Sequence, residues 1–325
     1  MMRSLLLVSL LCLSANLLSQ TVIDSGDVSG VWTQENSPYN IHGDIYVQAN
    51  QLLTIEPGVK VVFHGHYRLF LHNANLFALG SPEDSIVFTV ADTSGFANGE
   101  WDEGGWYGIN FSYPSNTGDS SHFGYCRFEY AKIPGDKYRS DMGVIGVNLL
   151  PRLTIRDCIF EHNKTQHEGL IDIHLSDLII RNNIFRYNEC AELISMQEDS
   201  PHIYGNRIDG NKCEVLLWIT AWNHPSIHHN MIINNSGQII RSEGNCRPRI
   251  YQNWILNNQG TIINFEKSRT EFINNLVANN DGTAFWLYKD ESVIVQNTIV
   301  NNSSHPESVI VLRETSNLIL GITQI

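Results

Sequence analysis

The six residues Asn230-Met-Ile-Ile-Asn-Asn235 form a phrase that recurs along this chain. Each copy begins with Asn or Cys, carries an aliphatic residue or Phe at its third position and ends with Asn. Copies follow one another about every 22 to 25 residues, a period typical of stacked structural repeats. The others are Cys158-Ile-Phe-Glu-His-Asn163, Asn183-Ile-Phe-Arg-Tyr-Asn188, Asn206-Arg-Ile-Asp-Gly-Asn211, Asn253-Trp-Ile-Leu-Asn-Asn258, Asn275-Leu-Val-Ala-Asn-Asn280 and Asn297-Thr-Ile-Val-Asn-Asn302, after a degenerate copy, Cys126-Arg-Phe-Glu-Tyr-Ala131.

A repeat of this length accommodates three short strands and three turns, which make one circuit of a coil. Each repeat contains β-branched runs such as Leu178-Ile-Ile180 and Val293-Ile-Val295, separated by polar turns. One circuit cannot bury its own apolar side chains, but circuits stacked about 4.8 Å apart pair in parallel and create a continuous core. The sequence therefore predicts an all-β, right-handed parallel β-helix, a solenoid with coils of about 22 to 25 residues, since right-handed crossovers are the default.

The recurrent asparagines are predicted to be structural, because identical amides at one corner can hydrogen-bond along the stack and satisfy turn backbone groups. Cysteines occupy similar columns: Cys126 and Cys158 start two copies of the phrase, and Cys190 and Cys213 follow its last Asn by two residues. Stacked neighbours lie close enough for a disulfide. Because parallel stacking aligns their side chains rather than turning them together, we predict buried or half-buried thiols.

The charge and the first residues bear on the compartment. A formal net charge of −13 and scattered Lys and Arg residues argue against nucleic acid and anionic membrane surfaces as partners. Met1-Met2-Arg3, the apolar run Leu5–Leu13 and the small residues near Ser19 make up the three parts of a secretory signal peptide. No later stretch is long and apolar enough to be a transmembrane segment. We therefore predict a secreted or cell-surface protein with a signal peptide over residues 1–20.

The rest of the chain, residues 21–325, is predicted to be a single parallel β-helix domain. Residues 21–118 are expected to form an N-terminal cap and the first coils, and residues 119–325 the regular Asn-ladder coils. Polar stretches at Asp92–Glu103 and Ile133–Val144 interrupt the strand pattern, so they are predicted to be insertions that protrude from the stack.

Motifs ahead of the regular repeats resemble the opening of secreted bacterial β-helix proteins. They are Gly30-Val-Trp32, Leu53-Thr-Ile-Glu-Pro-Gly58, Ala78-Leu-Gly80, Ile86-Val-Phe-Thr89 and Gly104-Gly-Trp106-Tyr-Gly108. Together with the Asn-rich coils they resemble the parallel β-helix repeats of the pectate-lyase-like superfamily. The resemblance covers nearly the whole chain after the signal peptide and implies the fold, whereas many such proteins have no assigned activity.

Many of these proteins end in a C-terminal sorting tail, whereas this sequence stops at Ile325 in mid-coil. Either the sequence is a fragment, or something else caps its last coil. An uncapped coil exposes strand edges that invite another chain. We therefore predict end-to-end self-association through the C-terminal coil, around Leu312–Ile325.

The strand that follows each copy of the phrase supplies candidate binding residues. In these strands, apolar residues such as Leu217 and Ile219 occupy the second and fourth positions, which must point inward. The third and fifth positions then form two outward columns. The columns are Asp172, Ser195, Trp218, Arg241, Asn264 and Trp286, and His174, Gln197, Thr220, Glu243, Glu266 and Tyr288.

These columns suit an extended carbohydrate, because sugar rings stack on aromatic faces while charged and amide groups hydrogen-bond hydroxyls or carboxylates. Trp222, on the adjoining turn, adds another platform. The candidate ligand-binding residues are Asp172, His174, Trp218, Trp222, Arg241, Asn264, Trp286 and Tyr288. The favoured function is a module that binds extended polysaccharide or serves as a rigid scaffold. An ordinary solvated face whose aromatics pack on neighbouring loops explains the pattern as well.

Two other functions remain open. The resemblance implies that lyases on this fold hold calcium with carboxylates beside a basic residue, and that hydrolases use clustered carboxylates. Glu243 and Glu266 with Arg241 are therefore weak catalytic candidates for a polysaccharide lyase or glycoside hydrolase acting on an acidic polysaccharide. Calcium is expected only for a lyase, and no metal site is predicted, because strand alternation and turns account for His64, His66 and His72. The third function is an adhesin.

Overall fold

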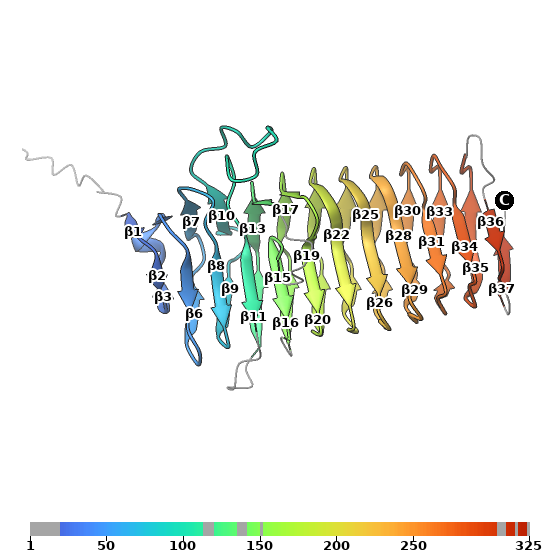
Figure 1. Ribbon diagram of the computed structural model, residues 1–325, viewed down its shortest axis with the longest axis horizontal. Helices are drawn as coiled ribbons and strands as arrows, with labels where there is room; N and C mark the ends of the chain where they lie inside the picture. The colour runs from blue at the N-terminus through green and yellow to red at the C-terminus, as the bar shows by residue number, and fades with distance from the viewer. Residues whose placement is uncertain are drawn as a thin grey trace, which may run out of the picture.

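The computed structural model describes residues 20–112, 120–134, 142–149, 152–303, 310–315 and 318–323. Within these residues the chain winds as a parallel β-solenoid of about 12 turns, as the repeat predicted (Figure 1). Residues 1–19 of the predicted signal peptide lie outside the described residues. So do parts of the second predicted insertion and of the segment predicted to self-associate.

One sheet, here called the long face, contains the strands that follow the phrase in each coil. All of its strand pairs are parallel, and each strand contacts its equivalent one coil away. In the described residues these strands are β2 (Gly26–Asp27), β5 (Ile45–Val47), β8 (Leu69–His72), β11 (Ile109–Ser112), β15 (Ile145–Asn148), β19 (Gly169–His174), β22 (Glu189–Gln197), β25 (Lys212–Thr220), β28 (Ser236–Glu243), β31 (Ile263–Glu266), β34 (Phe285–Tyr288) and β36 (Ile310–Arg313), with β14 (Lys132–Ile133) and β18 (Lys164–Thr165) beside them.

Two further faces close each coil, and the long strand β35 (Val293–Val300) runs through both of them. The second face contains β3 (Gly30–Trp32), β6 (Leu52–Ile55), β9 (Asn75–Leu79), β12 (Ser121–Gly124), β16 (Leu153–Arg156), β20 (Leu178–Arg181), β23 (His202–Tyr204), β26 (Ser226–His228), β29 (Arg249–Tyr251), β32 (Glu271–Ile273) and β37 (Ile319–Thr323). The third face contains β1 (Thr21–Ile23), β4 (Tyr39–Ile41), β7 (Lys60–Phe63), β10 (Ile86–Val90), β13 (Cys126–Glu129), β17 (Ile159–Glu161), β21 (Ile184–Arg186), β24 (Arg207–Asp209), β27 (Met231–Ile233), β30 (Trp254–Leu256) and β33 (Leu276–Ala278). A short 3-10 turn, η1 (Gln34–Asn36), lies in the first coils.

The inward register predicted for the long face is confirmed. Ile194, Leu217, Ile240 and Ile263 pair from strand to strand, and none is accessible to solvent. Alternation explains this arrangement, because successive side chains of a strand point to opposite sides of the sheet. The apolar residue at the same position of every coil therefore falls into one continuous core column.

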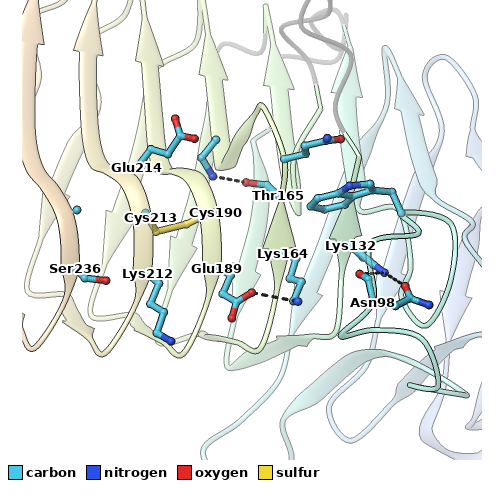
Figure 2. Close-up of a pocket in the computed structure, with 14 residues that line it drawn as sticks. Asn98, Lys132, Lys164, Thr165, Glu189, Cys190, Lys212, Cys213, Glu214 and Ser236 are labelled. Atoms are coloured by element: carbon cyan, nitrogen blue, oxygen red, sulfur yellow. Dashed lines mark hydrogen bonds and ion pairs between the residues drawn. A yellow bond between two sulfur atoms is a disulfide. The ribbon is translucent and has the colours of Figure 1, made fainter.

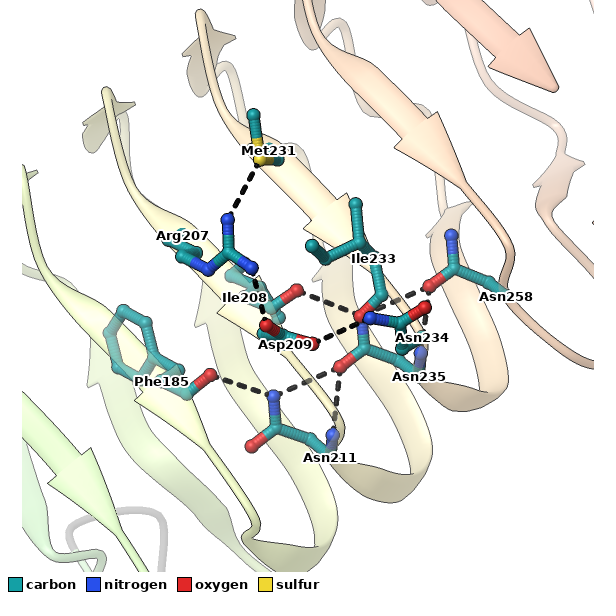
Figure 3. A network of polar contacts seen from close by, with 10 residues as sticks. All are labelled: Phe185, Arg207, Ile208, Asp209, Asn211, Met231, Ile233, Asn234, Asn235 and Asn258. Carbon is teal, nitrogen blue, oxygen red and sulfur yellow. Dashed lines mark hydrogen bonds and ion pairs between the residues drawn. The ribbon is translucent and has the colours of Figure 1, made fainter.

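The asparagine ladders form as predicted, and Figure 3 shows one of them. Asn211 donates through Nδ2 to the carbonyl of Phe185 (3.0 Å) and to Oδ1 of Asn235 (2.9 Å), while its own Oδ1 accepts from Nδ2 of Asn188 (2.8 Å). The residue before each ladder Asn has a left-handed φ, for example 58° at Asn234. Each amide thus satisfies backbone groups that a sharp corner leaves unpaired.

Cys190 and Cys213 form a disulfide, so the prediction of thiols was wrong for this pair. The two residues pair in register on β22 and β25, with Cα atoms 4.6 Å apart, within the range that a disulfide spans. Parallel stacking aligns the Cα–Cβ bonds, but each side chain can still rotate its sulfur toward the other. Cys126 and Cys158 are buried free thiols, as predicted.

Candidate functional site

The structure brings four of the predicted binding residues into one column of the long face. Trp218, Arg241, Asn264 and Trp286 pair strand by strand on β25, β28, β31 and β34, and each is partly exposed. Glu266 and Tyr288 pair likewise in the neighbouring column, next to Glu243. The sequence therefore identified the outward register of these strands correctly.

Glu243 holds the first part of this column in place. Nε1 of Trp218 donates to Oε1 of Glu243 at 3.0 Å, and Nη2 and Nε of Arg241 donate to Oε2 at 2.7 and 3.1 Å. Charge-assisted bonds of this kind fix both geometry and orientation. Glu243, a weak catalytic candidate from the sequence, thus positions an indole ring and a guanidinium group, with both of its oxygens engaged.

The second part of the column is an aromatic and polar surface one to two coils further along. The rings of Trp286 and Tyr288 lie 5.9 Å apart between centroids and are tilted by 39°. Glu266 forms an ion pair of 3.6 Å with Lys267, beside Asn264. Left-handed backbone conformations end these strands, with φ of 50° at Lys267, so the chain leaves the face directly after Glu266. Flat rings with adjacent hydrogen-bonding groups offer a platform for sugar rings.

Two predicted binding residues are placed differently from the rest. Asp172 has the predicted outward register, but it is only 3% exposed, so its carboxylate is not available at the surface. His174 lies in the neighbouring column on β19, two coils before β25, and its Nδ1 is 3.2 Å from Oδ1 of Asn148. The partly exposed binding residues Trp218, Arg241, Asn264, Trp286 and Tyr288 therefore lie together on β25 to β34.

Trp222 lies on the turn after β25, is 67% exposed and lines a separate hollow of about 460 Å³. Asp177, Glu198, Asp199 and His224 also line this hollow. Burial, followed by the nearby charges of Asp177 and Glu198, raises the pKa of Asp199 to about 8. Asp199 belongs to a further column of buried residues, at the end of the long face, which the sequence analysis missed. Its members are Ser176, Asp199, Asn223, Cys246, Ser268 and Asp290.

Glu192 is a further candidate that sequence reasoning missed. Burial, reinforced by the charges of Glu168 and Glu214, raises its pKa to about 7, although nearby Arg241 opposes the shift. Glu192 lies on β22 ahead of two consecutive buried residues, Leu193 and Ile194, so strict alternation begins only at Ile194. The outward columns start at Ser195 on this strand and keep their register, but they do not include the position of Glu192. The recurrence of Glu at 168, 192 and 214 was the available signal.

Across the part of the chain that the structure describes, no group of three or more His, Cys, Asp or Glu side chains is arranged to hold a metal ion. Over the same residues, no helix has the length and apolar character needed to cross a membrane.

Several solved structures of alginate-active proteins resemble this chain in fold. A variant of the periplasmic alginate epimerase AlgG has 13% identity and a TM-score of 0.44, over 87% of this chain and 77% of that chain. The alginate lyase AlyF-OU02, in complex with G6, has 14% identity and a TM-score of 0.35, over 90% and 57%. The A-module of the mannuronan C-5 epimerase AlgE6 from Azotobacter vinelandii has 14% identity and a TM-score of 0.24, over 93% and 90%.

These similarities concern the course of the chain and imply nothing about its activity. No curated protein matches the chain significantly in sequence. Residues 107–277, which include the regular Asn-ladder coils up to β33, match the sequence profile of the family described as right handed beta helix region. That match covers more than half of the sequence and agrees with the observed coils. The chain therefore belongs to the right-handed β-helix family.

Proposed function

We propose that the long face binds an extended polysaccharide, and that the protein does so at the cell surface or after secretion. The observation that carries the proposal is the column of Trp218, Arg241, Asn264 and Trp286 on four successive strands. Three strand spacings separate the two indole rings by roughly 14 Å. A chain of sugar rings lying along the solenoid axis can stack on both indoles and hydrogen-bond the guanidinium and amide between them.

The hydrogen bonds that hold Trp218 and Arg241 in place support binding by a rigid surface. Trp218 and Arg241 are already oriented by Glu243, so little side-chain freedom is lost when a ligand arrives. Preorganisation of this kind raises affinity because it lowers the entropic cost of binding. Trp286 and Tyr288 stand on neighbouring positions of one strand backed by the core, which also limits their movement.

A polysaccharide array probed with and without calcium tests this proposal, with Trp286→Ala as the decisive variant. We expect binding to weaken by about 1 to 3 kcal/mol, the range for loss of an aromatic anchor. The matched control is Trp254→Ala, because Trp254 is 53% exposed on β30 of the third face. Equal binding by the parent and by Trp286→Ala contradicts the proposal. Failure of the parent to bind any glycan favours a scaffold.

Glu192 favours a second candidate function, chemistry on a bound polysaccharide. A carboxyl group with a pKa near 7 can both donate and accept a proton at neutral pH. Under this alternative, the parent depolymerises or epimerises an acidic polysaccharide and Glu192→Gln abolishes turnover while binding persists. Glu271→Gln, which removes an exposed carboxylate on β32 of the second face, is the control. Binding without turnover by the parent, with or without calcium, rules this alternative out.

A further inference from the structure

A groove of about 600 Å³ lies outside the two outward columns of the long face (Figure 2). It is formed on the short strands β14 and β18 and on the first halves of β22, β25 and β28. Its lining includes Trp101, Lys164, Lys212 and Glu214, and the Cys190–Cys213 disulfide. A hollow of this size can enclose a small ligand or the end of a larger one.

The loop that overhangs the groove is the insertion predicted at Asp92–Glu103, and Lys132 anchors it. The ammonium group of Lys132 donates to the carbonyls of Gly95 and Glu103 at 3.0 Å each, to Oδ1 of Asn98 at 3.2 Å, and to the carbonyl of Glu100. Lys132 is only 1% exposed. The loop is therefore held rigidly, and Trp101, whose ring centroid lies 5.9 Å from this ammonium, is fixed at one end of the groove.

The groove carries cations in a protein whose formal net charge is −13. Strand pairing places Lys132, Lys164, Glu189 and Lys212 in one column across four coils. Figure 2 shows Lys164, Glu189 and Lys212 projecting from the same edge, with Glu214 on the opposite edge. Glu189 is already paired with Lys164 at 3.1 Å. Lys212 is exposed and has no ion-pair partner among the described residues, so its charge is uncompensated.

Small side chains line the middle of the groove. The disulfide and Ala191 cover part of it. Gly237 covers another part, and a Cβ atom added there would lie 1.8 Å from the carbonyl oxygen of Cys213. Glycine is therefore required where the backbones of adjacent coils approach each other. The disulfide links the two coils that carry Glu189 and Lys212, which fixes the spacing of the charged column.

We propose that this groove is a second carbohydrate site that binds an anionic oligosaccharide, with one sugar ring on Trp101 and the carboxylate of another ring at Lys212, three strand spacings or roughly 14 Å further along the column. An indole face packs against the apolar face of a sugar ring. An ammonium group without a partner supplies a charge-assisted hydrogen bond to a carboxylate. Glu214 lies on the edge of the groove opposite the lysines, so an anion is expected to bind only along the edge that carries Lys164 and Lys212. This site does not depend on the column that carries the proposed function.

Calorimetric titration of the full chain tests the site, with a galacturonate trimer and the fully methyl-esterified form of the same trimer as probes. We expect the trimer to bind at least about tenfold more tightly than its ester, because only the trimer has a carboxylate for Lys212. Lys212→Gln should remove this difference without changing binding of the ester. Trp101→Ala should weaken both probes by about tenfold.

Matched variants separate this site from general charge effects and from the long face. Lys60→Gln removes an exposed lysine on β7, and Trp254→Ala removes an exposed indole on β30; neither should change trimer binding. The inference is overturned if the trimer does not bind, or if Lys60→Gln weakens it as much as Lys212→Gln. It is also overturned if Trp286→Ala removes trimer binding while Trp101→Ala does not, a result that leaves the proposed function intact. Loss of polysaccharide binding without loss of trimer binding in Trp286→Ala supports both sites.

Discussion

The first coils and the Asn-ladder coils stabilise the same kind of stack by different means. On the third face, one core column is aromatic from Phe88 to Phe185, with Phe128, Phe160 and Phe185 stacked at 4.7 and 4.8 Å. Beyond Phe185 the same column becomes aliphatic, beginning with Ile208 and Ile232. The change comes one coil after Asn183 and Asn188, which are the first pair of ladder asparagines at both corners of the third face.

The polar groups at the corners differ as well. In the Asn-ladder coils one amide at each corner bonds to the coils before and after it, so a single residue type serves every coil. In the first coils, by contrast, the long loop Asp92–Glu103 is anchored by one buried ammonium group, that of Lys132 on β14. The repeated coils therefore satisfy their corners without an insertion, whereas the irregular coils carry a loop and, beside it, a groove.

The largest effect is expected from breaking a ladder, by Asn211→Ala. The substitution leaves the carbonyl of Phe185 and the backbone and amide N–H groups of Asn188 without their partner inside the stack. At about 1 to 3 kcal/mol for each buried unsatisfied group, the free energy of unfolding should fall by about 3 to 5 kcal/mol. Chemical denaturation measures it. Asn36→Ala, an exposed position in the first coils, should cost under about 0.5 kcal/mol, and similar losses would contradict the distinction.

Removing the buried ammonium tests the corresponding device of the first coils. Lys132→Met keeps most of the side-chain volume but leaves several loop oxygens without a donor, so we expect a loss of about 2 to 3 kcal/mol. Limited proteolysis should then cleave within Asp92–Glu103 while the Asn-ladder coils stay intact. Lys60→Met, at an exposed position of β7, should leave the loop protected. A loop that resists cleavage in Lys132→Met shows that other contacts hold it.

The buried column at the end of the long face predicts a pH dependence. Burial raises the pKa of Asp199 to about 8, so the folded chain keeps a proton that the unfolded chain releases near pH 4. This group therefore stabilises the fold least at high pH, and its contribution declines as pH rises from about 4 to 8. Asp199→Asn should be more stable than the parent by about 2 kcal/mol at pH 9, with a smaller difference at pH 4. A difference independent of pH would contradict the shifted pKa.

The smallest effect is expected at the outward aromatic residues of the Asn-ladder coils. Trp286→Ala should change the free energy of unfolding by no more than about 1 kcal/mol, because its side chain lies outside the core. Leu287→Ala, one residue further on the same strand and fully buried, should cost about 2 to 5 kcal/mol. Comparable losses in the two variants would mean that the aromatic side chains of this face pack on neighbouring loops, as the alternative interpretation in the sequence analysis holds.

The sequence by itself determined the coil, the ladders and the outward register of Trp218, Arg241 and Trp286. These features follow from the repeat period and from alternation within a strand, which are local properties repeated in every coil. Residues at the same position of different coils therefore have the same environment, except where the alternation is interrupted or a loop packs against the coil.

Only the tertiary structure decided the features that depend on such exceptions. Glu192 comes within electrostatic range of Arg241 two coils away, and Asp172 is buried on β19 although its register is outward. The loop around Lys132 creates a groove from residues more than thirty positions apart in sequence. Side-chain rotation joins Cys190 to Cys213, which strand alignment alone argued against. Each of these outcomes depends on how particular side chains and loops pack in three dimensions, because the burial of a group and its distance from other charges are set by packing, which the period of the repeat does not encode.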